Sequence, residues 1–391
     1  MLGKLLYKQE NLRRKLSREL KVLNTVYLSK SAFKHNYNFF RKLHPKSYVC
    51  PVLKSNAYGH GLIETAKICE KLNPPFIVVD SFYEVLELKK AGIKTPFLII
   101  GYTHPENYRH MKFSNIALTV TDNESIQALG DLNKEINIHL KVDTGMHRQG
   151  ISHEKIEKSL NLLKKYKNLK LEGVCTHLAD ADNPKNNSFT QLQVKNFKKV
   201  LKKFNQYGFN PKWRHISATS GAGKVFAKDF NMIRLGLGLY GESSLDNTDK
   251  YYKKYRFDKL QPVLKADSTI IDIKKLKKGD CVSYGCRFVA KKAMTIGIIP
   301  FGYYEGIDRR LTNKGFVYYR NKPCKILGTV CMNLTMIDLS NIKNPKKWEQ
   351  VEVIGRNSSN KNTARWMAQA CNTITYVIWT HIAPTIRRVS K

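Results

Sequence analysis

The chain has 391 residues, of which 42% are hydrophobic, and its 68 lysines and arginines against 31 aspartates and glutamates give a formal net charge of +37. This length and composition predict two globular domains and exclude a largely disordered protein. No apolar run approaches the ~18 residues of a membrane-spanning helix, and the N-terminus lacks the apolar core of a secretory signal, so we expect a cytoplasmic protein without a membrane span.

The basic residues are spread along the chain as lysine pairs and helical neighbours, with no RNA-binding signature and no basic stripe interleaved with aromatic residues. This distribution indicates a lysine-rich composition, and no specific nucleic-acid partner is expected. The eight cysteines include no Cys-x-x-Cys pair. Their scatter predicts buried free thiols in a reducing compartment and no metal site.

Residues 1–24 are predicted to form a basic amphipathic extension, because leucines recur there at helical spacing among lysines and arginines. We expect this helix to pack on protein, in preference to lying on an anionic membrane. A short strand is expected at Val26–Leu28, followed by a helix with Phe33, Tyr37 and Phe40 on one face.

Eight apolar, strand-like runs then alternate with lysine-rich helical segments; the runs begin at Val49, Phe76, Phe97, Ile116, Ile136, Leu171, Trp213 and Met232. Continuous apolar runs separated by helices are typical of a buried parallel sheet, and eight of them predict an α/β fold of the (β/α)8, TIM-like barrel type. A doubly wound open sheet is the structural alternative.

We place the barrel in residues 25–245, with the strand near 26–28 able to join the next domain. A polar stretch after Gly241 is a plausible linker. In residues 246–391 short strands with frequent turns predict a smaller, mostly β C-terminal domain. A helical stretch from Thr363 to Cys371 lies near its end.

Barrel active sites lie at the C-terminal ends of the strands, and the chemistry-bearing residues of this chain fall there. Lys54 follows the first run, and a lysine at the rim of an apolar pocket can form a Schiff base with a carbonyl cofactor. Two loops after the seventh and eighth runs, Ser217–Gly223 and Arg234–Gly241, are rich in serine, threonine and glycine and can cradle a phosphate. Together they predict a phosphorylated aldehyde cofactor.

The stretch Lys54–Gly61, KSNAYGHG, resembles the cofactor-lysine signature of alanine racemases, although Ser55 is more often alanine there. The resemblance extends from about Val26 to Val389. It implies an isomerase that holds pyridoxal 5′-phosphate on Lys54, interconverts L- and D-alanine, supplies D-alanine for peptidoglycan and works as a homodimer with composite sites. One alternative is a racemase of another or broader specificity, acting for example on serine or lysine. A related decarboxylase is a weaker alternative.

The resemblance also implies which residues hold the cofactor. The phosphate would meet the hydroxyls of Tyr58, Ser220 and Tyr376 and the backbone N–H groups of Gly236 and Leu237. Because HISATS is one residue longer than the family's serine loop, Thr219 is an alternative to Ser220.

Arg234 resembles the arginine that faces the pyridine nitrogen. A guanidinium can only donate, so it keeps that nitrogen unprotonated. An unprotonated ring is a weaker electron sink, which disfavours decarboxylation; related decarboxylases usually place a carboxylate there. His177 would bridge Arg234 and the second base.

Racemisation needs an acid/base group on each face of the substrate's Cα. Lys54 would serve one face, and Tyr284 in VSYG resembles the family's second base, which reaches the site from the partner subunit.

Four further residues carry implied roles. Arg148, oriented by Lys141, would lie near the substrate carboxylate, and Lys141 is carbamylated in several family members. The backbone N–H of Met332 would meet the carboxylate, and Tyr303 would line the entrance. The chain departs from the family pattern at three other positions, namely Asn333, Glu305 and Thr385.

Overall fold

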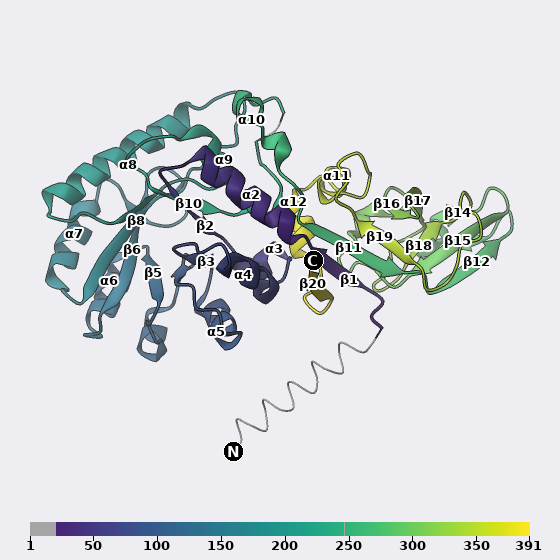
Figure 1. Cartoon of the computed structure of the whole chain (residues 1–391), viewed down its shortest axis with the longest axis horizontal. Helices are drawn as coiled ribbons and strands as arrows, with labels where there is room; N and C mark the ends of the chain where they lie inside the picture. The colour runs from purple at the N-terminus through teal and green to yellow at the C-terminus, as the bar shows by residue number, and fades with distance from the viewer. Residues whose placement is uncertain (1–20, 246) are drawn as a thin grey trace, which may run out of the picture. The chain divides into compact units, whose positions relative to one another are not determined.

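The computed structural model describes residues 21–245 and 247–391, so most of the predicted N-terminal extension, residues 1–24, lies outside the described residues. The described chain divides into two compact units (Figure 1). The barrel unit comprises residues 29–263 with 390–391, and the β unit comprises residues 21–28 with 264–389.

The barrel unit is built on eight parallel strands that neighbour one another in chain order. They are β2 (Tyr48–Pro51), β3 (Ile77–Val79), β4 (Phe97–Ile99), β5 (Ile116–Val120), β6 (Ile136–Asp143), β8 (Leu169–Cys175), β9 (Trp213–His215) and β10 (Met232–Leu235). A parallel bridge between Val52 and Val78, with the Leu53 N–H donating to the Val78 carbonyl at 2.8 Å, joins the first strand to the second. The ring therefore closes, which confirms the barrel and excludes the open sheet.

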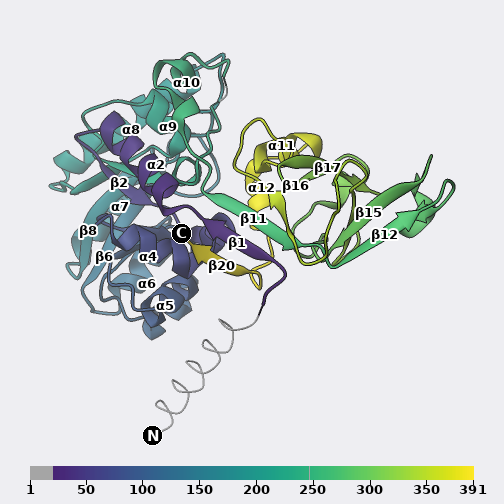
Figure 2. The same cartoon turned by 45° about the vertical axis from the view of Figure 1, so that its right-hand side comes forward.

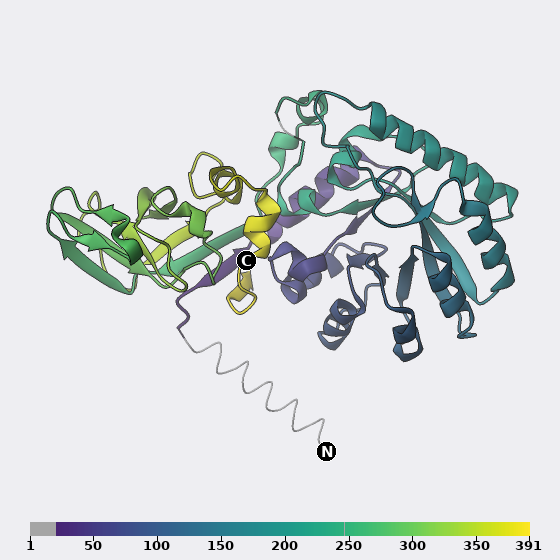
Figure 3. The ribbon, with the colours of Figure 1, turned by 180° about the vertical axis from the view of Figure 1, so that it is seen from behind.

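Helices cover the outside of this ring, as Figures 1 and 3 show. The helical segments of this unit are α2 (Lys30–Leu43), α3 (Lys54–Tyr58), α4 (Leu62–Glu70), α5 (Phe82–Lys90), α6 (Asn123–Gly130), α7 (Ile156–Lys165), α8 (Ser188–Gln206), α9 (Thr219–Lys224) and α10 (Lys250–Lys254). Short pieces are η1 (Pro105–His110), η2 (Leu237–Tyr240), η3 (Phe257–Lys259) and β7 (Ile151–Ser152), which pairs with β6. The predicted apolar face of α2 is confirmed, because Phe33, Tyr37 and Phe40 are buried.

The β unit is a nine-stranded sheet in the order β12-β15-β18-β17-β16-β19-β11-β1-β20. Its strands are β1 (Thr25–Leu28), β11 (Leu264–Thr269), β12 (Asp272–Leu276), β15 (Met294–Ile299), β16 (Phe316–Tyr319), β17 (Lys322–Leu327), β18 (Thr335–Asp338), β19 (Gln350–Ile354) and β20 (Arg387–Ser390). A separate hairpin pairs β13 (Cys281–Val282) with β14 (Phe288–Val289), and the other pieces are η4 (Tyr284–Cys286), η5 (Arg309–Leu311), α11 (Ala364–Ala370) and α12 (Thr375–Thr380). Helix α11 lies over β16 (Figure 2), where the rings of Trp366 and Phe316 meet edge to face at 5.9 Å.

The compact units divide between Val263 and Leu264, later in the chain than the boundary expected after residue 245. Residues just before this division pack into the barrel unit, since the buried Phe257 ring lies 5.6 Å from Phe39 and 5.8 Å from Phe40. At the other end, β1 pairs antiparallel with β11 and so belongs to the β unit.

All eight cysteines are free thiols. Five are buried as expected, but Cys281 and Cys286 are exposed and Cys331 is half-buried, so the prediction of buried thiols is wrong for these three. None of the helices within residues 21–245 and 247–391 combines the length and apolar character that a bilayer-crossing segment needs.

Candidate active site

Lys54 stands at the carboxyl edge of the barrel, directly after β2, on an unusual turn. Its Nζ lies 3.7 Å from Oδ1 of Asp80, which follows β3. Residues Ser55–Tyr58 all have left-handed backbone, with φ between 52 and 56°. Each such residue costs about 1–2 kcal/mol relative to the right-handed form, so other contacts must hold this turn.

Two side chains hold the left-handed turn. The Ser55 N–H donates to Oε1 of Glu84 at 2.7 Å, and the Leu62 N–H donates to Oδ1 of Asn56 at 2.8 Å. Asparagine also tolerates the left-handed region better than most residues. The turn therefore fixes the path of the chain from Lys54 to Tyr58.

The Tyr58 hydroxyl lies against the backbone that follows β10. A Cβ placed on Gly236 would stand only 2.6 Å from this hydroxyl, so a residue other than glycine would displace Tyr58. The Tyr58 ring also packs on Tyr240, with 5.0 Å between centroids. Two predicted phosphate ligands, from distant parts of the chain, thus meet at one cradle.

Helix α9 adds hydroxyls in the same barrel unit. Thr219 is buried, and its Oγ1 accepts the Gly238 N–H at 2.9 Å, so it stabilises the glycine turn. Ser220 is less buried and its hydroxyl hydrogen-bonds the hydroxyl of Ser244. This arrangement favours Ser220 over Thr219 as a phosphate ligand and brings in Ser244, which the sequence interpretation missed although it adjoins the glycine-rich run.

The Arg234 guanidinium is buried and held on both terminal nitrogens. Nη1 donates to Nδ1 of His215 at 2.5 Å, and Nη2 donates to the Thr176 carbonyl at 2.8 Å and to Nδ1 of His177 at 3.1 Å. None of the hydrogen bonds within the described part of the chain uses Nε. The Nε–H is therefore a donor left for another group.

The hydrogen bonds of Arg234 determine the tautomers of its neighbours. A guanidinium only donates, so Nδ1 of His215 is an acceptor and its proton sits on Nε2, which donates to Nδ1 of His139 at 2.8 Å. Burial, with the nearby Arg234 charge, lowers the pKa of His139 and of His177 to about 3 and that of His215 well below its usual range. All three imidazoles are neutral at pH 7, and His177 carries its proton on Nε2.

His139 and His215 were missed by the sequence interpretation. Each is a fully buried polar residue inside a predicted strand run, INIHLKV and WRHIS. A polar side chain buried in a barrel strand needs a hydrogen-bond partner, because burying it without one costs free energy. A histidine in such a run is therefore the signal that could have found these two residues.

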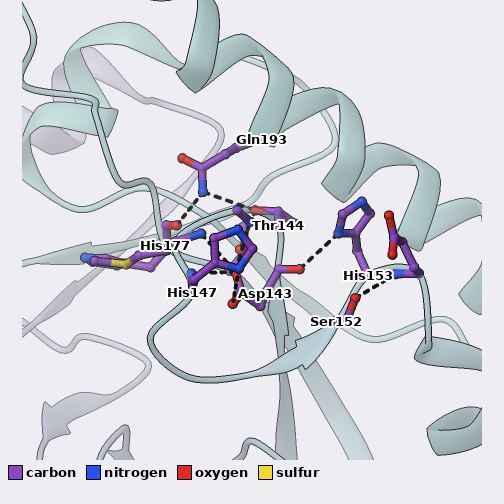
Figure 4. A network of polar contacts seen from close by, with 11 residues as sticks. Asp143, Thr144, His147, Ser152, His153, His177 and Gln193 are labelled. Atoms are coloured by element: carbon purple, nitrogen blue, oxygen red, sulfur yellow. Dashed lines mark hydrogen bonds and ion pairs between the residues drawn. The ribbon is translucent and has the colours of Figure 1, made fainter.

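A buried glutamine of α8 holds the backbone around His177 (Figure 4). Nε2 of Gln193 donates to the His177 carbonyl at 3.0 Å and to Oγ1 of Thr144 at 3.3 Å, and its Oε1 accepts the Ala179 N–H at 2.9 Å. Gln193 thereby ties the ends of β6 and β8 together and fixes the direction of His177.

The loop after β6 is ordered by Asp143, also seen in Figure 4. Its Oδ1 accepts the N–H groups of Gly145, Met146 and His147 at 2.9, 2.9 and 3.2 Å. Partial burial raises the pKa of Asp143, but these three hydrogen bonds outweigh it and leave the pKa below its usual value. Asp143 therefore shapes this loop as a carboxylate.

Lys141 lies inside β6, two residues before the end of the strand. Burial lowers its pKa, with the positive charges of Arg234, Arg148 and Lys54 acting in the same direction. Nζ of Lys141 donates to Oε1 of Gln149 at 3.1 Å, whereas the exposed Arg148 makes no hydrogen bond within residues 21–245 and 247–391. The structure thus pairs Lys141 with Gln149 instead of Arg148.

In the β unit, Tyr284 is 73% exposed on the tip of the β13–β14 hairpin. The tip is fixed by Thr329, whose Oγ1 donates to the Tyr284 carbonyl at 2.8 Å and whose carbonyl accepts the Ser283 hydroxyl at 2.7 Å. The phenol is therefore presented to solvent by a backbone that is held in place.

Two neighbouring loops carry Tyr303 and Met332. The Tyr303 N–H donates to the Cys331 carbonyl at 3.0 Å, which joins the loops. Asn333 donates from Nδ2 to Oε1 of Glu305 at 2.8 Å, so two of the three departures from the family pattern contact each other. Tyr376 occupies the second position of α12, half-buried.

Comparison with known proteins decides the family. Residues 28–244 match the family described as "Alanine racemase, N-terminal domain", and residues 263–390 match "Alanine racemase, C-terminal domain". The chain belongs to the alanine racemase family. It is therefore an enzyme of the isomerase class, as the resemblance at Lys54 predicted.

Relatives support this membership along most of the chain. The alanine racemases of Carboxydothermus hydrogenoformans and Geobacter sp. (strain M21) are 34% and 33% identical, over 91% and 93% of this chain and 96% and 97% of their own lengths. The solved alanine racemase of Clostridium difficile 630 has a TM-score of 0.87 at 28% identity, covering 95% of this chain and 97% of that one. The Bacillus anthracis structure with bound L-Ala-P has a TM-score of 0.86 at 28% identity, covering 95% and 96%.

Proposed function

We propose that this member of the alanine racemase family interconverts L- and D-alanine with pyridoxal 5′-phosphate, using two bases. The cradle of Tyr58 and Gly236, the Ser220 hydroxyl and the unused Nε–H of Arg234 fit a phosphorylated pyridine aldehyde. Lys54 would hold it covalently, and Leu237 N–H and the Tyr376 hydroxyl would complete the phosphate site. When bound, this cofactor withdraws electrons from the substrate and makes its Cα–H acidic.

The held guanidinium of Arg234 is the observation that carries the proposal. Two neutral histidines and three backbone carbonyls orient it, and none of its atoms can accept a proton. A pyridine nitrogen opposite its Nε–H stays an unprotonated acceptor. This supports racemisation over decarboxylation, for which a carboxylate at that place is usual.

Proton transfer is assigned to one base on each face of Cα. Nζ of Lys54 would exchange the proton on one face, and the hydroxyl of Tyr284 of the partner subunit would exchange it on the other. Because Nδ1 of His177 accepts from Arg234, its Nε2–H is free to donate to that phenolate and favour its formation. Arg148 and the Met332 N–H would bind the carboxylate of the substrate, and Tyr303 would line the entrance.

The surface around Tyr284 supports the proposal of a homodimer with composite sites. Large side chains of three hydrogen-bonded loops are exposed there in the single chain, namely Tyr284 (73%), Tyr304 (55%), Met332 (55%), Tyr303 (41%) and Leu334 (39%). Several exposed large apolar side chains together favour an interface with another copy. The D-alanine formed in the cytoplasm would serve peptidoglycan synthesis.

The decisive experiment is a chiral assay of the purified protein over alanine, serine and lysine, together with an absorbance spectrum. We expect alanine to be racemised fastest, and borohydride reduction to fix the cofactor on Lys54, as peptide mapping would show. A label on another lysine, or preference for a different amino acid, would overturn the corresponding part of the proposal.

A further inference from the structure

A polar side chain lies on the buried face of helix α8. Gln193 is fully buried, and Val194 and Phe197 are buried on the same helix. Burying an amide without partners costs free energy, and an apolar side chain would fill the same space without that cost. Gln193 instead uses both of its N–H groups and its carbonyl oxygen in hydrogen bonds to residues that follow β6 and β8.

The orientation of the Gln193 amide is fixed by its backbone partners. Oε1 accepts the Ala179 N–H at 2.9 Å, and Nε2 donates to the His177 carbonyl at 3.0 Å. A flipped amide would set an N–H group against the N–H of Ala179 and an oxygen against the carbonyl of His177, so only one orientation satisfies both. The side chain thus gives the segment that leaves β8 the pairing that a neighbouring strand would otherwise give it.

The second N–H of Gln193 sets the direction of a pair of hydroxyls. It donates to Oγ1 of Thr144 at 3.3 Å (Figure 4), and Oγ1 of Thr144 lies 2.8 Å from Oγ1 of Thr176. Both threonines are buried. Because the Thr144 oxygen accepts from Gln193, its own proton is available to Thr176. Gln193 and Thr144 therefore hold two successive residues, Thr176 and His177.

These two residues supply the shorter hydrogen bonds of one nitrogen of Arg234. Nη2 donates to the Thr176 carbonyl at 2.8 Å and to Nδ1 of His177 at 3.1 Å, and a third bond goes to the Ile216 carbonyl at 3.3 Å. A displacement of Thr176 and His177 would therefore turn the guanidinium and the imidazole together.

We propose that Gln193 and Thr144 are positioning residues of the reaction, which hold Thr176 and His177 in place so that Arg234 and His177 keep their directions. Neither side chain is assigned to the cofactor or the substrate, so both act through Arg234 and His177. The effect on rate rests on the proposed function. The hold on the His177 ring can be tested without any activity.

The kinetic test uses two substitutions at Thr144 that differ in the hydroxyl. Thr144→Val keeps the shape of the side chain but removes the acceptor of Gln193 and the partner of Thr176. Since a misplacement of about 1 Å can cost about a hundredfold in rate, we expect kcat to fall at least about tenfold. KM should change little, because the groups assigned to substrate binding are unchanged. Thr144→Ser restores the hydroxyl and should recover most of the kcat.

Gln193→Met tests the same network from the helix. It leaves the Ala179 N–H and the His177 carbonyl without the partners that the Gln193 amide provides. Buried backbone groups that lose their partners destabilise the fold, so this variant should lose stability as well as kcat. Thr144→Val, which leaves both of those bonds in place, separates the loss of position from the loss of stability.

Nitrogen NMR of the histidine rings in the holoenzyme gives a readout that a general loss of stability would not move. Nδ1 of His177 accepts from Arg234, so a single neutral tautomer with its proton on Nε2 is expected in the parent. Burial lowers the pKa of His177 to about 3, with the positive charges of Arg234, Arg148, Lys141 and Lys54 acting in the same direction. A displaced ring should show mixed tautomers and a pKa nearer its usual value of about 6.5.

We expect this change of the His177 ring in Thr144→Val and its absence in Thr144→Ser. Thr190→Val is the matched control, because it makes the same substitution at a fully buried threonine of α8. The Thr190 hydroxyl has no hydrogen-bond partner within residues 21–245 and 247–391. This control should keep the kcat and the His177 signals of the parent.

The outcomes separate this proposal from the proposed function. Parent-like His177 signals in Thr144→Val would overturn the hold on the ring, and changed signals with an unchanged kcat would overturn its role in the reaction. Equal losses of kcat in Thr144→Val and Thr190→Val would point to packing alone and contradict the proposal. Failure of the parent protein to racemise alanine would instead contradict the proposed function, while the NMR comparison would still decide whether Gln193 and Thr144 hold His177.

Discussion

Arg234 has no polar partner that could take its proton, because its guanidinium is surrounded by carbonyls and by neutral histidines. Two of the three imidazoles form a series, in which Arg234 donates to His215 and His215 donates to His139, while His177 accepts separately from Arg234. This order leaves the guanidinium fixed in direction and fully charged. In the proposed function, the direction in which Arg234 would donate to the cofactor is therefore set by these buried groups.

Arg234→Glu should change the reaction as well as the rate. Glutamate can accept a hydrogen bond, so the ring nitrogen would take a proton and become a stronger electron sink. We expect racemisation to fall by at least about a hundredfold, with more conversion of alanine to pyruvate, as chiral chromatography and a pyruvate assay would measure. Arg234→Lys, which still only donates, should lose rate without gaining pyruvate; equal pyruvate in both variants would contradict this role.

The buried histidines also predict how stability depends on pH. His139 and His177 have pKa values of about 3, and that of His215 is well below its usual range. Since the unfolded chain binds these protons near pH 6.5 and the native barrel does not, the free energy of unfolding should fall on acidification below about pH 6.5. The slope is up to about 1.4 kcal/mol per pH unit for each histidine.

Urea unfolding between about pH 7 and about pH 5 measures this slope. His139→Gln removes one of the three groups and should reduce the proton uptake on unfolding by about one. An unchanged slope in this variant would show that His139 does not stay neutral in the native barrel.

Among the structural elements, the left-handed turn of α3 depends on the side chain of Asn56 as well as on that of Glu84. Asn56 accepts the Leu62 N–H and stands at φ 55°. Asn56→Ala loses both the acceptor and the tolerance of this backbone, and should lower the free energy of unfolding by about 1–2 kcal/mol and speed cofactor loss. Asn56→Asp keeps both features and is the control; if alanine and aspartate behave alike in thermal unfolding, the turn is held by other contacts.

Helix α9 is joined to the N-terminus of α10 by a buried ion pair. Nζ of Lys224 lies 2.9 Å from Oδ2 of Asp249, both side chains are 1% exposed, and Nζ also donates to the Asn183 carbonyl at 2.6 Å. Lys224→Met should cost about 3–5 kcal/mol because it leaves a buried carboxylate unpaired. The double variant Lys224→Met with Asp249→Leu should recover most of this loss in denaturant unfolding; a loss equal to that of the single variant would argue against the pairing.

For the whole molecule, the composite site predicts complementation between two inactive variants. Lys54→Ala removes the base of one face and Tyr284→Phe that of the other. If each site takes Lys54 from one chain and Tyr284 of the partner subunit, a mixed dimer has one intact site and one with both lesions. Its activity should return towards half that of the parent dimer.

Refolding the two tagged variants together and isolating the mixed dimer measures this directly. Each variant refolded alone is the control and should stay inactive. Inactive mixed dimers would mean that both residues serve a site of one chain, and the composite site would be abandoned.

The barrel could be predicted from the sequence because each of its strands is marked by a local run of mostly apolar residues. Most residues of the eight runs are apolar and buried, as expected for strands of a covered parallel sheet, and each run overlaps the strand that the structure has there. Lys54 and Arg234 could be placed at the carboxyl edge by the same pattern, because position along a strand is a local property. The family resemblance at Lys54–Gly61 then supplied their expected chemistry.

Contacts between distant segments depended on the tertiary structure. The approach of Tyr58 to Gly236, the hydrogen bond of Thr219 to Gly238 that favours Ser220, and the histidine series beside Arg234 each join residues far apart in the chain. No periodicity or motif specifies which polar atoms meet, since that depends on how the strands register and close. Burial then lowers the pKa of these histidines, and burial belongs to the folded state alone.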